Sequence, residues 1–211
     1  MKFTEFFWDF DGTLIDTYPV SVQILKAALG GAPLEEQEAL GLMKNTLGIC
    51  VEEYARRNGQ TREELMTAFR REEGRLPLKG FPPLPGIPET LRRLRELGCR
   101  HYLFTHRDHL AWRILEAHGL RDCFEGGVTQ EEGFPKKPDP SGLLHLMRKA
   151  NVSPEECVMI GDRPMDLEAG RRAGMRVCML DPEGFFPEEQ GLRCEDAHAL
   201  AELIRPERLP L

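Results

Sequence analysis

Close to its start the chain reads Phe6-Phe7-Trp8-Asp9-Phe10-Asp11-Gly12-Thr13-Leu14-Ile15-Asp16. An apolar run of strand-forming residues leads directly into two carboxylates, Asp9 and Asp11. Because side chains alternate along an extended backbone, these two carboxylates are expected on the same side. Gly12-Thr13 offers a bend at which backbone amides can approach an anion. The stretch therefore predicts a buried strand that ends in an acidic site.

Two carboxylates this close repel each other unless a cation or a proton lies between them. Hard oxygen ligands suit Mg²⁺, and a divalent metal offsets the charge of a phosphate group. The pattern therefore indicates a site for a divalent metal and a phosphate. The structural alternative is a strand end that leads into an acidic turn, because turn signals commonly follow strands.

The segment from Asp9 to Leu14 resembles the first signature, D-x-D-G-T-L, of the haloacid dehalogenase-like (HAD) hydrolases. Three later segments are similar to that family's second signature, a hydrophobic strand ending in Thr or Ser, to its third, K-P-x-P, and to its fourth, G-D-x-x-x-D. They are Leu103-Phe104-Thr105-His106, Lys137-Pro138-Asp139-Pro140 and Gly161-Asp162-Arg163-Pro164-Met165-Asp166. The four segments follow the family's order, and the resemblance covers residues 1–16 and 81–181.

The rest of the chain predicts an α/β fold with a helical insertion. Strand-like runs at 3–8, 99–104, 124–129, 157–160 and 176–180 alternate with amphipathic helices from residue 87 onward, and a last helix is expected over 196–204. Such alternation implies a Rossmann-like parallel sheet with helices on both faces. Residues 17–80 instead carry only helical patterns, including 34–43, 51–57 and 61–76, the last opening with a capping box at Thr61 and Glu64.

A proline-rich stretch between Pro77 and Pro88 separates the two patterns, which puts a boundary near Gly80-Phe81. We therefore expect an α/β hydrolase core formed by residues 1–16 and 81–211, and a small all-helical cap formed by residues 17–80. Position and length of the insertion fit the helical cap of the family that the chain resembles.

Ligands of parallel sheets bind beyond the carboxyl ends of the strands, where the signature residues fall. The resemblance implies catalytic roles for three residues, substrate contacts for three and metal ligation for four. The catalytic set is Asp9, Asp11 and Lys137; the substrate set is Thr105, His106 and Lys137; the metal set, for Mg²⁺, is Asp9, Asp11, Asp162 and Asp166. Simpler roles stay open: Thr105 as a turn residue, His106 as the start of a helix, and Asp166 as a helix cap.

The chemistry that the resemblance implies is a covalent route. Asp9 attacks phosphorus, Asp11 protonates the leaving alkoxide as a general acid, and water then hydrolyses the aspartyl phosphate. Lys137 supplies a fixed ammonium that reduces the repulsion between the attacking carboxylate and the phosphate. A sugar phosphomutase of the β-phosphoglucomutase type and a non-catalytic HAD-like scaffold protein are the two alternatives.

Composition limits the partners. The chain has 211 residues, 41% of them hydrophobic, and a formal net charge of −7, which disfavours nucleic acid and anionic membranes as partners and favours a small phosphorylated metabolite. The six cysteines form no C-x-x-C pair, and no segment is long and apolar enough to span a membrane. The predicted strand begins too early to leave room for a signal peptide. A cytoplasmic protein is expected, with its oligomeric state left open.

Overall fold

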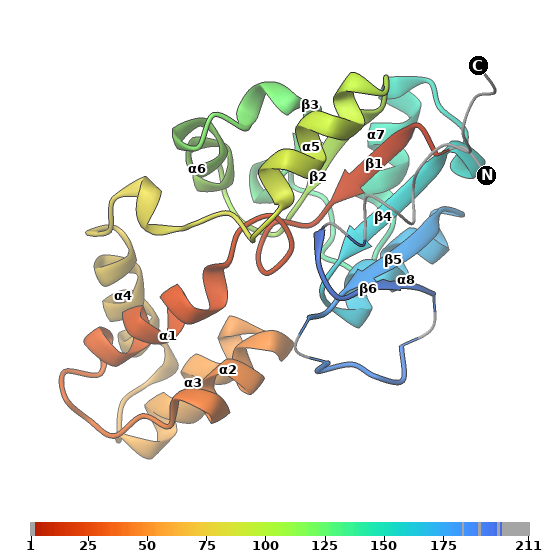
Figure 1. Ribbon diagram of the computed structural model, residues 1–211. Coiled ribbons are helices and arrows are strands. Elements are labelled where there is room, and N and C mark those ends of the chain that lie inside the picture. Colours follow the sequence, from red (N-terminus) through yellow and green to blue (C-terminus); the bar gives the residue numbers. More distant parts are fainter. Residues whose placement is uncertain (1–2, 183, 190, 198, 200–211) are drawn as a thin grey trace. The chain divides into compact units, whose positions relative to one another are not determined.

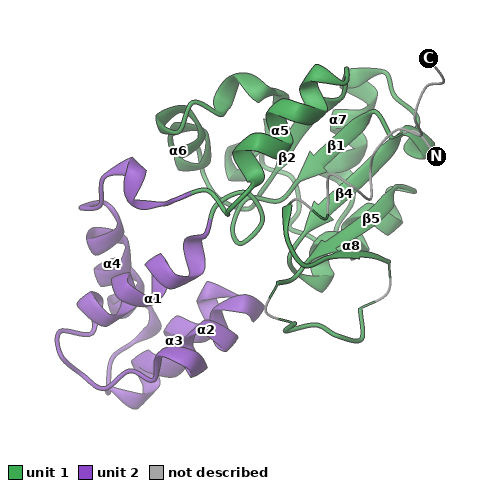
Figure 2. Cartoon of the chain, viewed as in Figure 1, with its two compact units in different colours: residues 1–15, 83–211 green, residues 16–82 purple. Residues whose placement is uncertain are grey.

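The computed structural model describes residues 3–182, 184–189, 191–197 and 199. Contacts divide the chain into two compact units, which are residues 1–15 with 83–211, and residues 16–82 (Figure 2). The helical unit thus begins at Asp16 rather than at residue 17, and ends at Pro82 rather than at residue 80. Most of the helix expected over 196–204 lies outside the described residues.

The first unit is built on a six-stranded sheet with the order β3-β2-β1-β4-β5-β6, in which every neighbouring pair is parallel (Figure 1). The strands are β1 Glu5–Trp8, β2 Arg100–Phe104, β3 Phe124–Val128, β4 Cys157–Gly161, β5 Arg176–Leu180 and β6 Leu192–Cys194. The first strand lies in the middle, between β2 and β4, and all four of its residues are buried. This central position explains the apolar run Phe6–Trp8, because both faces of the strand are covered.

Helices cover both faces of this sheet. They are α5 Ile87–Glu96, α6 Leu110–Ala117, α7 Ser141–Ala150 and α8 Pro164–Arg172, with short 3₁₀ helices η2 Arg121–Cys123, η3 Gln130–Glu132 and η4 Pro154–Glu156. On one face Phe7 belongs to a buried apolar cluster with Leu143 of α7 and Leu167 of α8. The other face includes His101 of β2, which contacts α5 at the Leu91 carbonyl oxygen, 3.1 Å from its Nε2. The α/β class with a Rossmann-like parallel sheet is confirmed.

The second unit is all-helical. Its elements are α1 Thr17–Ala28, α2 Glu36–Asn45, α3 Leu47–Arg57, α4 Arg62–Glu73 and η1 Leu78–Gly80. The capping box at the start of α4 forms as the sequence predicts, with Thr61 N–H donating to Glu64 at 2.7 Å and Glu64 N–H donating to the Thr61 hydroxyl at 3.2 Å. Helix α3 begins before the expected residue 51 because Thr46 caps it, its hydroxyl accepting from Ile49 N–H at 3.1 Å.

The two chain connections between the units run side by side. Ile15 and Pro83 form an antiparallel bridge inside the first unit, where Leu84 N–H also donates to the Leu14 carbonyl oxygen at 3.1 Å. Inside the second unit Asp16 N–H donates to the Pro82 carbonyl oxygen at 2.9 Å. The proline-rich stretch is therefore tied to the outgoing chain directly beyond the end of the D-x-D-G-T-L segment.

Candidate active site

The predicted site residues follow the carboxyl ends of the central strands. Asp9 follows β1, and its N–H donates to the Ile160 carbonyl oxygen of β4 at 2.9 Å. Thr105 follows β2 and donates its N–H to the Val128 carbonyl oxygen of β3 at 3.0 Å. Asp162 follows β4 directly. Because these strands are parallel and adjacent, their ends meet at one edge of the sheet, and residues far apart in sequence come together there.

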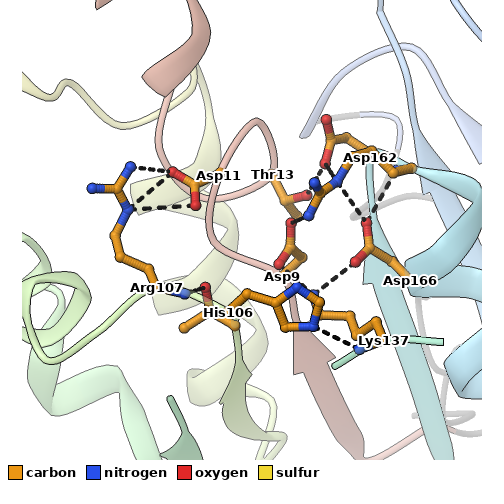
Figure 3. Close-up of polar contacts among 10 residues, drawn as sticks. Asp9, Asp11, Thr13, His106, Arg107, Lys137, Asp162 and Asp166 are labelled. Atoms are coloured by element: carbon orange, nitrogen blue, oxygen red, sulfur yellow. Dashed lines mark hydrogen bonds and ion pairs between the residues drawn. The ribbon is translucent and has the colours of Figure 1, made fainter. Parts of the chain in front are cut away.

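Three carboxylates form a compact buried group at this edge (Figure 3). Asp9, Asp162 and Asp166 each place one oxygen within 4.8 Å of the others, and their side chains are at most 1% exposed. Burying three like charges so closely requires cations to offset them.

Lys137 supplies one of those cations. Its buried Nζ lies 2.5 Å from Asp9 Oδ1 and 2.7 Å from Asp166 Oδ1. Burial on its own lowers the pKa of the ammonium, but the charges of Asp166 and Asp9 outweigh that effect and raise it above the usual range. Lys137 therefore stays charged at neutral pH and bridges two of the three carboxylates.

The two carboxylates on Lys137 differ in their acidity. Burial, together with the charge of Asp166, raises the pKa of Asp9 to about 7, against the opposing effect of Lys137. Burial also raises the pKa of Asp166, but Lys137 and Arg163 outweigh it and the net shift is downward. Asp9 is thus the carboxylate that most needs a further positive charge to stay ionised at neutral pH.

Asp166 acts both in this group and as a helix cap. Its Oδ2 accepts from Arg163 N–H at 3.1 Å at the start of α8, while its Oδ1 accepts from Lys137. Gly161 makes this approach feasible, because a Cβ at that position would lie 2.3 Å from the Asp166 Cβ. The glycine of the G-D-x-x-x-D segment is therefore a close-packing residue between β4 and α8.

Asp11 lies apart from the three carboxylates. Its Oδ1 accepts from Arg107 Nη2 at 2.8 Å and from Arg107 Nε at 3.1 Å (Figure 3). Contrary to the prediction from the sequence, the side chains of Asp9 and Asp11 therefore do not lie on the same side of an extended strand. The strand ends at Trp8 and the chain then turns tightly, with the Phe10 carbonyl oxygen accepting from the N–H groups of residues 13, 14 and 15. The geometry gives no support to the Asp11 carboxylate as a metal ligand beside Asp9.

Thr105 and His106 each make a local contact. The Thr105 hydroxyl accepts from Arg107 N–H at 3.0 Å, so the turn role left open by the sequence is present, and the same hydroxyl still has a proton to donate. His106 Nε2 accepts from Lys137 N–H at 2.6 Å. Burial, Lys137 and Arg163 lower the pKa of His106 to about 3, so the imidazole is neutral, as an accepting nitrogen requires. His106 therefore supports the backbone of Lys137.

The family model that matches this chain is that of the haloacid dehalogenase-like hydrolases, over residues 6–174. The chain belongs to this family. A phosphoglycolate phosphatase from Aquifex aeolicus is 30% identical to it over 82% of each chain. Among solved structures, a hydrolase from Streptococcus pneumoniae is 30% identical with a TM-score of 0.66, covering 84% of this chain and 92% of its own. The resemblance found from the four signature segments is confirmed.

A further solved structure shows how closely the fold agrees. A predicted phosphoglycolate phosphatase from Haemophilus somnus has a TM-score of 0.83 and covers 97% of this HAD-like hydrolase and 99% of its own chain. At 18% identity this likeness concerns the fold alone. Among the described residues, no helix is long and apolar enough to cross a membrane.

Sequence reasoning missed one charged residue of this HAD-like site. The Arg163 guanidinium lies 3.7 Å from Asp166, 3.8 Å from Asp9 and 3.9 Å from Asp162. Its position directly after Asp162 is the one sequence signal for it, since the signature leaves that position open. Thr13 is also in contact, with its hydroxyl 3.4 Å from Asp162 Oδ1. The carboxylate group is therefore bordered by two cations and a hydroxyl.

The donor set of this HAD-like hydrolase fits Mg²⁺. Asp9 Oδ2 is buried and makes no hydrogen bond within the described part of the chain, although Arg163 approaches it to 3.8 Å. A buried carboxylate oxygen without a hydrogen bond destabilises the folded protein unless a cation binds it. Three clustered carboxylates offer the hard oxygen ligands that Mg²⁺ prefers. Asp9, Asp162 and Asp166 are the residues that would hold the ion.

Proposed function

We propose that this HAD-like hydrolase is a Mg²⁺-dependent phosphatase that hydrolyses a small phosphorylated metabolite through an aspartyl phosphate. The observation that carries the proposal is the environment of Asp9. This buried carboxylate has one oxygen on Lys137 and the other without a hydrogen bond among the described residues, beside two further carboxylates. A nucleophile for phosphoryl transfer needs such a fixed orientation and nearby positive charge.

In the first step Asp9 forms a bond to phosphorus as the bond to the leaving oxygen breaks, and Asp11 gives its proton to that oxygen. In the second step Asp11 takes a proton from a water molecule, and the water oxygen forms a bond to phosphorus as the bond between Asp9 and phosphorus breaks, which releases phosphate. Lys137 holds the orientation of Asp9 throughout and offsets charge on the phosphoryl group. Bound Mg²⁺ would supply further charge compensation for the carboxylates and the phosphate.

Asp11 must exchange partners to act in this way. In the structure its carboxylate is held by Arg107, and it is not among the three carboxylates of the cluster that contains Asp9. Proton transfer therefore requires Asp11 to leave Arg107 and turn to the leaving oxygen when substrate binds. Thr105 lies two residues before Arg107, and its hydroxyl is the donor we assign to a phosphate oxygen.

The relatives that carry the name phosphoglycolate phosphatase make phosphoglycolate the first ester to test. The formal charge of −7 supports a metabolite rather than a nucleic acid as substrate. All six cysteines are buried and free, which supports a reducing compartment such as the cytoplasm. The sugar phosphomutase alternative rests only on the presence of both Asp9 and Asp11.

The test is phosphate release from a panel of phosphate monoesters that includes phosphoglycolate, p-nitrophenyl phosphate and hexose phosphates. We expect release that requires Mg²⁺, stops on chelation and is abolished in Asp9→Asn. Thermal unfolding should shift upward with Mg²⁺, and Asp162→Asn should remove that shift because it removes one of the three carboxylates. Isomerisation of a hexose phosphate without phosphate release would support the mutase instead. An Asp9→Asn variant of undiminished activity would refute the proposed nucleophile.

A further inference from the structure

Arg163 lies beside oxygens of the carboxylate cluster that Lys137 does not contact. The Lys137 ammonium binds Oδ1 of Asp9 and Oδ1 of Asp166. The Arg163 guanidinium lies 3.8 Å from Oδ2 of Asp9 and 3.7 Å from Oδ2 of Asp166. It also lies 3.9 Å from Oδ1 of Asp162, the third carboxylate. The two cations therefore approach the cluster at different oxygens.

The guanidinium acts on these oxygens through its charge. All three distances are longer than a hydrogen bond, so the charge offsets that of the carboxylates without a hydrogen bond to them. Asp9 Oδ2 accepts no hydrogen bond from the described residues. A Mg²⁺ ion on the same carboxylates would lie close to the guanidinium, and cations at short range in a largely buried site repel each other strongly. Arg163 therefore competes with the metal as the counter-ion of the cluster.

The position of this charge is fixed by the start of α8. Arg163 N–H donates to Asp166 Oδ2 at 3.1 Å, and Asp166 N–H donates to the Arg163 carbonyl oxygen at 3.0 Å. The side chain of Arg163 is 13% exposed. Its effect on a metal depends on where the charge lies, and other contacts of the guanidinium do not remove it.

The charge balance shows what the guanidinium changes. With all three carboxylates ionised, the two cations Lys137 and Arg163 leave the cluster with a net charge of −1. Binding of Mg²⁺ alone brings that net charge to +1, and a phosphate dianion returns it to −1. Without Arg163 the same three states carry −2, 0 and −2. Arg163 therefore opposes Mg²⁺ in the empty site and favours the phosphate group.

We propose that Arg163 is a built-in counter-ion that keeps the Mg²⁺ affinity of the empty site low and raises the affinity of the metal-loaded site for phosphate. Firm retention of the metal then depends on a bound phosphate group, whose negative charge offsets the repulsion from Arg163. This inference rests on the proposed Mg²⁺-dependent phosphatase function and names the residue that regulates metal binding at the same site.

Isothermal titration calorimetry measures both affinities on the whole chain without turnover. The probes are Mg²⁺ alone, and inorganic phosphate added to protein saturated with Mg²⁺, at about pH 8, above the raised pKa of Asp9. In Arg163→Gln we expect the Kd for Mg²⁺ to fall roughly 10-fold and the Kd for phosphate to rise roughly 10-fold, the usual size of a coupling between two sites. Arg163→Lys keeps the charge, so both Kd values should stay near those of the wild type.

Two further variants complete the design. Arg163→Ser, at the N-cap of α8 where serine is favoured, guards against a folding defect in Arg163→Gln and should show the same two changes. Arg172→Gln is the matched control, because it removes an exposed arginine of α8 that pairs with Glu168, and it should leave both Kd values unchanged. An unchanged or higher Kd for Mg²⁺ in the two neutral variants, or a phosphate Kd that does not rise, overturns the role of Arg163 alone. Failure of Mg²⁺ to bind to any of these proteins refutes the proposed metal dependence as well.

Discussion

At the scale of single residues, the site depends on how a few buried charges are distributed. Lys137 contacts both Asp9 and Asp166, and Arg163 lies within 4 Å of all three carboxylates. Asp9 and Asp11 have different partners, Lys137 and Arg107, although only one residue separates them in the sequence. The divergence of these two aspartates, one buried on a lysine and one part-exposed on an arginine, suits different roles as nucleophile and acid.

Replacing Lys137 tests the buried ion pairs. In Lys137→Met the carboxylates of Asp9 and Asp166 lose their shared cation, and removing one partner of a buried pair costs about 3–5 kcal/mol of unfolding free energy. We expect denaturant unfolding to show that loss and kcat/KM for a phosphate ester to fall at least ~100-fold. The neighbouring Lys136 is exposed, so Lys136→Met is the matched control. Equal behaviour of the two variants would contradict the role of Lys137.

Replacing His106 separates support of Lys137 from contact with substrate. In His106→Ala the buried N–H of Lys137 loses its acceptor, so we expect kcat to fall roughly tenfold while KM changes little. His106→Gln should restore part of kcat, because the amide oxygen can accept the same hydrogen bond. Steady-state kinetics at saturating and limiting ester concentrations provide both constants. A rise in KM at constant kcat would instead support the substrate contact expected from the sequence.

At the scale of elements, the site depends on the close approach of α8 to the end of β4. Gly161 has no side chain where Asp166 crosses it, and Gly170 of α8 likewise lies close to β4, since its Cβ would be 2.7 Å from the Met159 Cβ. The sequence predicted both elements, a strand over 157–160 and a helix over 165–173, and in the structure the helix begins at Pro164. The short distance between α8 and β4 depends on side-chain packing, and the only sign of it in the sequence is the pair of glycines, Gly161 and Gly170.

Gly161→Ala tests this approach. The added Cβ would overlap Asp166, so α8 or Asp166 must move, and overpacking of this kind costs about 1–3 kcal/mol. We expect lower stability in denaturant unfolding and weaker Mg²⁺ binding in calorimetry. Gly126→Ala, in β3, is the control, because a Cβ there has nothing within 4 Å. An unchanged Mg²⁺ affinity in Gly161→Ala would contradict the expectation that Mg²⁺ binding depends on the position of Asp166 beside Gly161.

Two elements, strand β6 and the start of helix α3, were not predicted correctly from the sequence patterns. Strand β6, Leu192–Cys194, was not predicted, because three residues without an apolar run carry little signal. It pairs with β5 at Cys178↔Leu192, and the sheet supplies its hydrogen-bond partners. Helix α3 began early for a similar reason, since the cap at Thr46 defines the helix start better than the first apolar residue does.

At the scale of the whole molecule, the acid stability of the folded chain should depend on His101. Trp8 Nε1–H donates to His101 Nδ1 at 3.0 Å, and burial lowers the pKa of this histidine to about 4 from the ordinary 6.5. The unfolded chain therefore takes up the proton first as the pH falls. Stability from the neutral histidine is fully present above pH 6.5 and is lost as the pH drops toward 4.

As the pH falls from 6.5 to 5, the protonation of His101 in the unfolded chain lowers the unfolding free energy by about 2 kcal/mol. We expect urea unfolding of the wild-type protein to show a loss of that order over this range, beyond the loss seen in His101→Asn, which cannot titrate. The comparison uses the change with pH rather than the absolute stability, so a general destabilisation by the substitution does not affect it. Parallel pH profiles for the two proteins would refute the assignment.

The sequence by itself determined the α/β class, the order of strands β1 to β5 with the helical insertion after β1, and four residues that meet at one site. Apolar runs followed by polar residues specify strand ends, and parallel pairing brings those ends to one edge, which predicts that Asp9 and Asp162 meet. Lys137 and Asp166, which join them, were found from the resemblance to the family's third and fourth signatures. Only the tertiary structure decided the partners of each group. It pairs Asp11 with Arg107 and brings Arg163 to the carboxylates, because the chain turns after Trp8 and side-chain contacts across strands are not encoded in local periodicity.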